Sequence, residues 1–187
     1  GTPAEGGDPR TAETLIPGIV QNGGAVTLDG IRIQGGTGNA IHMAPSATGL
    51  TLRNSILVGA DVAESQGVHA HGTVLVEDTR ISRFGAAVNQ AGGTLTLQET
   101  RLQANATGVA LDGPAVLQTS LNGVTLDNPG GAGLHVLSAP ATAQVSLLNS
   151  SFDLHATSLK MDTPVALSAS GVSFTNAEQQ TDGVPES

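Results

Sequence analysis

The sequence predicts an all-β fold, a right-handed single-stranded parallel β-helix of about seven coils with three short strands in each coil. Two observations lead to this prediction. A strand–bend–strand segment recurs seven times along the chain, at intervals of about 23 residues. After each of the first six copies comes a third short strand with the pattern apolar, variable, apolar. Such coils bury their inward side chains against their neighbours, so an isolated coil is not expected to fold.

The repeated segment is clearest at residues 26–33, where Val26 and Leu28 alternate with Thr27 before a bend at Gly30. This alternation places the two apolar side chains on one face of a strand and the threonine on the other. The first inward anchors of the copies are Leu28, Leu52, Val76, Leu97, Leu121, Leu147 and Ala169. The second anchors are Ile33, Leu57, Ile81, Leu102, Leu126, Phe152 and Phe174. We expect each set to form a vertical stack.

The second residue after each first anchor marks the bend. These residues are Gly30, Asn54, Asp78, Glu99, Gly123, Asn149 and Gly171. Six of the seven are Gly, Asn or Asp, the residue types that tolerate a left-handed backbone. Glu99 is the exception, and we expect strain or a slightly different bend there.

The third strands are predicted at residues 41–43, 68–70, 86–88, 109–111, 134–136 and 159–161. An earlier partial coil is expected near residues 16–21. No third strand follows the seventh copy, so the chain is expected to end in a cap or tail after Phe174. The predicted domains are an N-terminal tail at 1–14, the β-helix at 15–176 and an acidic C-terminal tail at 177–187.

The composition restricts the classes of function. The net charge is −9 with only seven Lys and Arg residues, so the chain lacks the basic stripe that nucleic-acid binding requires, and an anionic membrane surface is disfavoured. There is no cysteine, which excludes disulfides and thiolate metal sites. No apolar run is long enough for membrane insertion. Because the chain starts with Gly and shows no signal peptide, we expect a piece of a longer protein. No cofactor is predicted.

The repeated pattern V-x-L-x-[DNE]-[GST]-x-[IL] resembles that of the right-handed parallel β-helix, or pectin-lyase-like, superfamily over residues 15–176. The scarcity of aromatic residues and lysine, and the abundance of Gly, Ala and Thr, are most similar to the passenger domains of bacterial autotransporter adhesins. This resemblance implies a secreted or cell-surface bacterial protein. In the superfamily the face of the first strands, of the 41–43 type, and the turns beside it form the substrate groove.

The outward column of these first strands carries the candidate ligand-binding residues. The column is predicted to contain His42, His69, Ala87, Ala110, His135 and Lys160. Four of them, His42, His69, His135 and Lys160, are candidates for binding a ligand. His42 and His69 are expected on successive coils, close enough to hold a divalent metal together, with His71 two residues further on. Exposed histidines on a strand are also common as simple polar surface residues.

Two other outward columns have simpler interpretations. One contains Thr27, Thr51, Leu75, Thr96, Ser120, Ser146 and Ser168, which favours a solvated strand face over an ice-binding surface. The other places Arg80 and Arg101 on neighbouring coils, close to Glu77, Asp78 and Glu99. That arrangement favours surface ion pairs over a site for an acidic sugar.

The first-strand face lacks the residues that an enzyme of this fold requires, so no catalytic residue is predicted. A hydrolase of this fold needs two or three carboxylates at fixed separation, whereas this face offers only Asp112, Asp162, Asp61 and Glu64, with no Asp-Asp pair. We therefore expect a non-catalytic structural or adhesive module that binds a protein or glycan on a cell surface. Its contacts are expected in this face or in the turns at 35–39, 59–66, 127–132 and 137–143. The alternatives are a polysaccharide-binding or polysaccharide-processing domain, and a secreted effector or scaffold that binds a protein partner.

Overall fold

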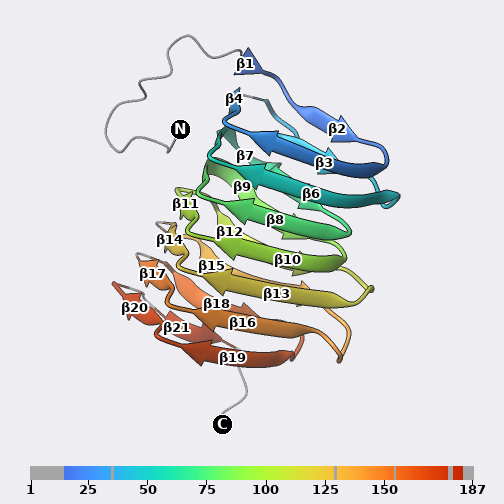
Figure 1. Ribbon diagram of the computed structural model, residues 1–187. Helices are drawn as coiled ribbons and strands as arrows, with labels where there is room; N and C mark the ends of the chain where they lie inside the picture. Colours follow the sequence, from blue (N-terminus) through green and yellow to red (C-terminus); the bar gives the residue numbers. More distant parts are fainter. Residues whose placement is uncertain (1–14, 35, 129, 154, 177–178, 183–187) are drawn as a thin grey trace.

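The computed structural model describes residues 15–34, 36–128, 130–153, 155–176 and 179–182. These residues form strands β1 to β21, which stack in parallel as a solenoid of about seven turns, as predicted (Figure 1). The predicted N-terminal tail, residues 1–14, lies outside the described residues. In the described part of the chain, no helix has the length and hydropathy that a membrane crossing requires.

The second strand of each coil belongs to a seven-stranded parallel sheet, which we call the second-strand sheet. Its members are β3 (Gly24–Asp29), β6 (Ala47–Arg53), β8 (Thr73–Glu77), β10 (Gly93–Gln98), β13 (Leu117–Asn122), β16 (Gln144–Leu148) and β19 (Ala166–Ser170). They follow one another in chain order from one end of the solenoid to the other (Figure 1).

The remaining strands form a fourteen-stranded sheet, because two long strands run from one side of the solenoid to the other. These are β7 (Ile56–Ala70) and β9 (Arg80–Gln90). The strands after the bend are β1 (Leu15–Ile16), β4 (Arg32–Gln34), β11 (Arg101–Gln103), β14 (Thr125–Asp127), β17 (Ser151–Asp153) and β20 (Ser173–Thr175). The first strands of the coils are β2 (Ile19–Gln21), β5 (Ile41–Met43), β12 (Thr107–Asp112), β15 (Ala132–Ser138), β18 (Thr157–Met161) and β21 (Gln179–Asp182).

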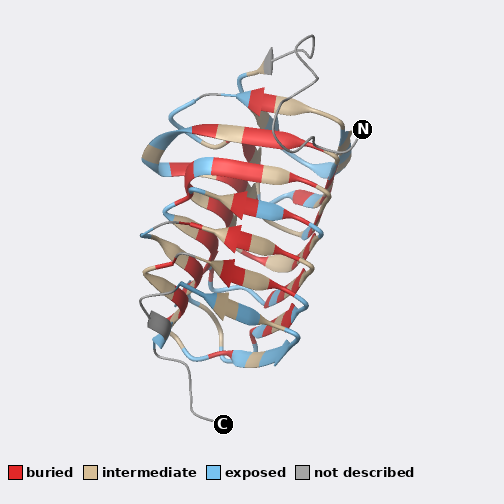
Figure 2. Ribbon diagram, turned by 90° about the vertical axis from the view of Figure 1, so that its left-hand side faces the viewer, coloured by how far each residue is buried: buried red, intermediate tan, exposed pale blue. Residues whose placement is uncertain are grey.

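The strand register confirms both predicted core stacks. Leu28 pairs with Leu52, Leu52 with Val76, and the series continues without a slip to Ala169. The second anchors pair in the same way from Ile33 to Phe174. In the middle coils these side chains are fully buried (Figure 2). Each such aliphatic side chain contributes about 1.5–3 kcal/mol by leaving water.

The bends are uniform, which corrects the expectation of a different bend at Glu99. All seven bend residues have positive φ, from 46° at Glu99 to 65° at Gly30 and Gly171. The Glu99 amide still donates to the carbonyl of Asn122 on the next coil, at 3.0 Å, so the left-handed residue turns the chain without breaking the ladder. Glu99 therefore carries the backbone strain that Gly avoids at the equivalent positions.

Buried hydroxyl groups support the bend from inside. Thr79, Thr100 and Ser150 each donate to the carbonyl two residues earlier, at 2.8, 2.9 and 2.8 Å. The hydroxyls of Thr79 and Ser150 also accept an amide hydrogen bond from the preceding coil, at 3.3 and 3.2 Å. These hydrogen bonds satisfy backbone groups that the turning chain leaves unpaired in the core.

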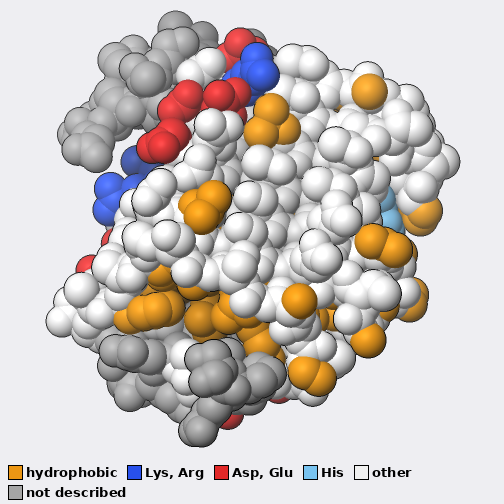
Figure 3. Space-filling model, turned by 60° about the horizontal axis from the view of Figure 1, so that its bottom comes forward, with side chains coloured by type: hydrophobic (Ala, Val, Ile, Leu, Met, Phe, Trp, Pro, Cys, Tyr) orange, Lys and Arg blue, Asp and Glu red, His pale blue; other side chains and the backbone are white. Residues whose placement is uncertain are grey.

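The two ends of the solenoid differ from each other. The partial coil predicted near residues 16–21 is confirmed, because β1 pairs with β4 and β2 pairs with β5. At the other end, β21 pairs in parallel with β18, so residues 179–182 continue the solenoid beyond the predicted end of its strands. The last coil leaves Leu167, Val172 and Phe174 only partly buried. Figure 3 shows hydrophobic side chains gathered near this end.

The strain at Glu99 can be measured. Glu99→Asn should raise the free energy of unfolding by about 1 kcal/mol, because Asn tolerates a left-handed backbone better and stands at the equivalent bends at 54 and 149. Chemical denaturation followed by circular dichroism measures the change. Gln98→Asn, in the strand just before the bend, is the matched control and should not stabilise. Equal stabilities of the two variants would contradict the strain.

Candidate functional site

The first-strand face is a continuous column of outward side chains, and its membership differs from the prediction at one coil. The register gives Val20, His42, His69, Asn89, Ala110, His135, Lys160 and Asp182. Asn89 therefore takes the place predicted for Ala87, which is fully buried. The prediction was wrong because Gln90, not an apolar residue, occupies the inward position after Asn89, and the apolar pattern at 86–88 indicated the wrong register.

Gln90 is held inside by the turn that it precedes. Its amide nitrogen donates to the carbonyl of Gly93 at 2.8 Å, and its amide oxygen accepts from the Thr119 hydroxyl at 2.5 Å. Gln21 makes the same contact with the carbonyl of Gly24, at 2.8 Å, so glutamine plays this role at the equivalent turn of two coils. A hydrogen-bonded glutamine can therefore replace an apolar residue in this core.

The predicted candidates separate into two groups along the face. His42, His69 and His71 form the first group, and His135 and Lys160 form the second. The coils that carry Asn89 and Ala110 lie between them. At a coil spacing of about 4.8 Å, His69 and His135 stand about 14 Å apart, too far to share one small ligand or ion.

The first group, which we call the histidine cluster (His42, His69 and His71), has two kinds of ring contact. The rings of His42 and His69 stack, with centroids 5.0 Å apart and planes inclined by 14°. The rings of His69 and His71 meet at 68°, with their Nε2 atoms 3.2 Å apart. Only the second contact brings two ring nitrogens toward one point.

Neighbouring amides fix the protonation of two of these rings. The Nδ1 atom of His69 lies 2.7 Å from Oε1 of Gln66, and because an amide oxygen only accepts, His69 carries its proton on Nδ1. The Nδ1 atom of His42 lies 3.2 Å from Nδ2 of Asn39, which donates, so neutral His42 carries its proton on Nε2. His69 Nε2 is thus a free acceptor, and His71 donates to it.

The environment of His69 and His71 favours their neutral imidazoles. Burial lowers the pKa of His69, repulsion from His71 and His42 lowers it further, and the Asp112 carboxylate opposes the shift. Burial and repulsion from His42 also lower the pKa of His71. Both rings therefore keep a lone pair at neutral pH.

The second group is an ion-pair network on the surface. His135 Nε2 lies 2.7 Å from Oδ2 of Asp162, and Lys160 Nζ lies 3.7 Å from the other carboxylate oxygen. The hydrogen bond from His135 is the main cause that lowers the pKa of Asp162, and the charge of Lys160 lowers it further. Asp162 thus already occupies the polar groups of His135 and Lys160, which would otherwise face a ligand.

Other predicted polar groups also pair with one another. Asp61 accepts from Arg83 at 2.9 Å through Nε, and this contact lowers the pKa of the Asp61 carboxyl group. Arg101 and Arg80 are register partners, as predicted, and Arg101 lies 3.7 Å from the carboxylate of Asp127. These contacts favour the ion-pair interpretation of the arginine column.

His155 is a buried histidine that the sequence analysis did not single out. It is 1% exposed, packs edge-on against Phe152 with ring centroids 5.8 Å apart, and neither ring nitrogen makes a hydrogen bond of normal geometry. Burial lowers its pKa, while the carbonyls of Leu126 and Asn128 and the carboxylates of Asp127 and Asp153 oppose the shift. The signal that could have found it is its place just past β17, the strand after the bend, because Asn128 is also buried just past β14, one coil earlier.

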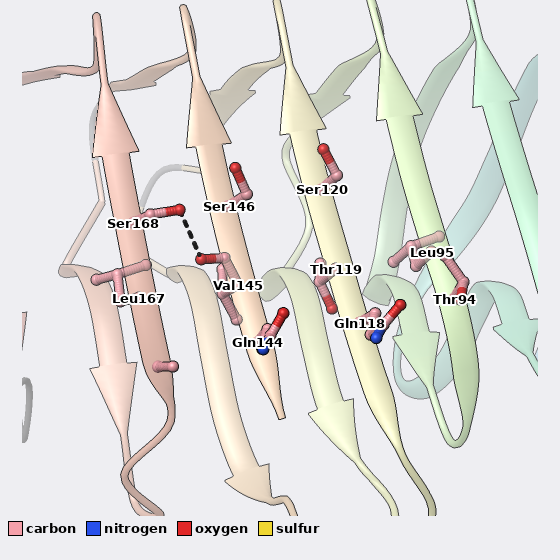
Figure 4. Close-up of a pocket in the computed structure, with 11 residues that line it drawn as sticks. Thr94, Leu95, Gln118, Thr119, Ser120, Gln144, Val145, Ser146, Leu167 and Ser168 are labelled. Atoms are coloured by element: carbon pink, nitrogen blue, oxygen red, sulfur yellow. Dashed lines mark hydrogen bonds between the residues drawn. The ribbon is translucent and has the colours of Figure 1, made fainter. Parts of the chain in front are cut away.

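A shallow groove of about 380 Å³ runs across the second-strand sheet (Figure 4). Its outward polar groups come from successive strands, with Gln118 and Gln144 in one row and Ser120, Ser146 and Ser168 in the next. It lies on a different sheet from the histidine cluster. Its lining residues carry no charged group, and most of the groove surface is apolar, with the amides and hydroxyls set among Leu95, Val145 and Leu167.

No protein-family model matches the chain, and no curated protein matches it at a level that would indicate a relative.

The burial of His155 predicts acid sensitivity. Because the pKa of His155 is lower in the folded state than the ordinary 6.5, its effect on stability is absent well above pH 6.5. Below that pH the unfolded imidazole is protonated first, and stability falls by up to about 1.4 kcal/mol per pH unit until the folded pKa is reached. Denaturation curves between neutral and acid pH measure this slope.

Two variants isolate the contribution of His155. His155→Phe keeps an aromatic ring beside Phe152, and His155→Gln keeps a polar group, but neither side chain titrates. Both variants should reduce the dependence of the free energy of unfolding on pH by the equivalent of up to one bound proton. The dependence that remains comes from other groups such as His69 and His71. An unchanged slope in both variants would contradict the assignment.

Proposed function

We propose that this chain is a non-catalytic structural and adhesive β-helix module of a secreted or surface-displayed bacterial protein. The observation that carries the proposal is the register of the first anchors, which pair from coil to coil without a slip from Leu28 to Ala169. Seven second strands at about 4.8 Å spacing make a rod whose turns and faces project at fixed intervals. Such a rod resists unfolding locally and presents an extended surface to a protein or glycan.

Among the regions predicted to be contact turns we favour residues 59–66, which the structure places inside strand β7 as an irregular stretch rather than as a turn. Its exposed side chains include Asp61 and Glu64, and the Arg83–Asp61 ion pair fixes its base. Both Asp61, with φ of 58°, and Arg83, with φ of 65°, adopt left-handed conformations that shape this irregular stretch of β7 and the part of β9 beside it. The segment follows the buried Leu57 and precedes the buried Val68, so the core holds both of its ends.

Adhesion assays test the proposal. Beads coated with the chain should bind bacterial-host cell surfaces or a glycan array, with multivalent display raising the apparent affinity by about 10²–10⁴. Replacing Glu64 and the exposed Ala63 by Ser should weaken this binding and leave the melting temperature unchanged, because both side chains point to solvent. Thr27→Ala, on the exposed outer face of β3, is the control.

The proposal fails if the multivalent beads bind no cell or glycan surface above the level of beads that carry an inert protein. Binding that is lost equally in the Ala63→Ser, Glu64→Ser double variant and in Thr27→Ala would place the contact outside the 59–66 segment. That result would contradict this segment as the contact region.

The groove on the second-strand sheet favours a second candidate function, the binding of a polysaccharide. Sugar hydroxyls exchange hydrogen bonds with amides and hydroxyls, and Gln118, Gln144, Ser120 and Ser146 repeat along the groove at the coil spacing. A repeating row of donors and acceptors suits a repeating polymer. Because none of the lining residues of the groove is aromatic, no side chain there stacks on a sugar ring, and the expected affinity is low.

A double variant tests this second candidate. Gln118→Ala with Gln144→Ala should weaken binding to a neutral polysaccharide by about tenfold, since each lost hydrogen bond contributes about 0.5–1.5 kcal/mol. Gln98→Ala, on the same face of β10 but outside the groove, is the control. Affinity electrophoresis measures the change. If the polysaccharide retards both variants equally, or does not retard the parent chain, the groove is excluded as the binding site. Release of unsaturated sugar products in a separate incubation would indicate that the chain processes the polysaccharide rather than only binding it.

A further inference from the structure

The His69–His71 contact has the geometry of a metal chelate. His69 is the next-to-last residue of β7 and His71 follows the strand directly, so the two side chains project to the same side. Their Nε2 atoms are 3.2 Å apart. Two imidazole nitrogens bound to one Zn²⁺ or Cu²⁺ at about 2.0–2.1 Å, with an angle between 90° and the tetrahedral value, stand roughly 2.9–3.4 Å apart.

We propose that His69 and His71 chelate one divalent transition-metal ion through their Nε2 atoms, independently of the adhesive function. The ion lies to one side of the line that joins the two Nε2 atoms, because at their separation of 3.2 Å the line itself leaves no point about 2.0–2.1 Å from both, and it replaces the hydrogen bond between them. His71 binds through Nε2 after its ring proton moves to Nδ1 by exchange with water. Both imidazoles stay neutral, and no net proton is released.

A neighbouring residue prepares His69 for this role. Ligating histidines usually donate their second ring N–H to a carbonyl or carboxylate, which fixes the tautomer and aims the ligating nitrogen. Gln66 accepts the Nδ1 proton of His69 at 2.7 Å, which leaves Nε2 free to bind the ion. Gln66 is therefore a positioning residue for the site.

The structure favours a different pair of ligands from the one that the sequence predicts, which is His42 and His69. The two rings stack at 14°, so their nitrogens do not converge on one point. The Nδ1 lone pair of His42 is used by Asn39, and its Nε2 carries the proton. His42 instead covers one face of the His69 ring.

The number of ligands sets the class of ion. Among the residues that the structure describes, no three His, Asp or Glu side chains converge on one ion position. The chain thus supplies two imidazoles, and water fills the remaining positions. Imidazole ligands suit Cu²⁺, Ni²⁺ and Zn²⁺ rather than Ca²⁺ or Mg²⁺, and Cu²⁺ binds most tightly in this series.

The test is a titration of the full chain with Cu²⁺ alone, in a buffer that does not chelate metal. Equilibrium dialysis gives the stoichiometry, and electron paramagnetic resonance counts the imidazole nitrogens. Relative to the double variant His69→Ala with His71→Ala, the parent should bind one additional ion per chain, with two equatorial imidazole nitrogens. Each single variant should lose at least about tenfold in affinity, and Gln66→Ala should lose about tenfold through misorientation of His69.

Two histidine variants serve as controls. His135→Ala removes a histidine of the same column whose Nε2 is held by Asp162, and His42→Ala removes the stacked neighbour. Both should keep the parent stoichiometry and the two-imidazole spectrum. The proposal is overturned if the double variant binds as many ions as the parent with the same spectrum, or if His42→Ala abolishes binding while His71→Ala preserves it.

Discussion

The hydrogen bonds between successive coils are the constraint on which the rest of the structure depends. They hold each residue directly beside its equivalent in the next coil, without a slip along the second-strand sheet from Leu28 to Ala169. The coil spacing of about 4.8 Å then becomes the spacing of every surface row and every core stack. The bend preserves this constraint, because even at Glu99 the left-handed residue keeps its amide in the ladder.

This constraint also governs which polar residues can neighbour one another. Like charges in one column would repel at the coil spacing, and the chain answers with opposite charges nearby, as in the Arg53–Glu77 pair at 2.9 Å and the Asp162 network. Histidine offers a different solution, because imidazole rings on successive coils can stack face to face, as those of His42 and His69 do. In the core, where no water can help, Asn105 donates to the carbonyl of Ile81 at 3.2 Å and accepts from the amide of Phe84 at 3.1 Å.

The repeated aliphatic anchors made the fold predictable, because alternation of apolar and polar residues reports directly which face is buried. The same reasoning failed where a polar side chain turns inward. Gln90 hid the correct register of the first strand, and four polar residues at 179–182 gave no apolar signal for β21. The sequence placed His42 and His69 side by side correctly. It did not reveal which nitrogens converge, since that depends on the amides of Asn39 and Gln66 and on the turn that carries His71.

The position of the two surface groups along the rod determines how firmly each is held. A coil with neighbours on both sides buries its core residues completely, as Leu57 and Val68 are around the histidine cluster, whereas the last coil leaves Leu167 and Phe174 partly open. Local opening in a stacked array begins at the ends, where each coil has one interface instead of two. On that sheet β5 and β2 lie beyond His69 at one end, and β18 and β21 lie beyond His135 at the other, so both groups have neighbouring coils on both sides. The histidine cluster therefore rests on fully packed core residues, and firm placement is what a two-ligand chelate needs, because no third side chain compensates for movement of either ring.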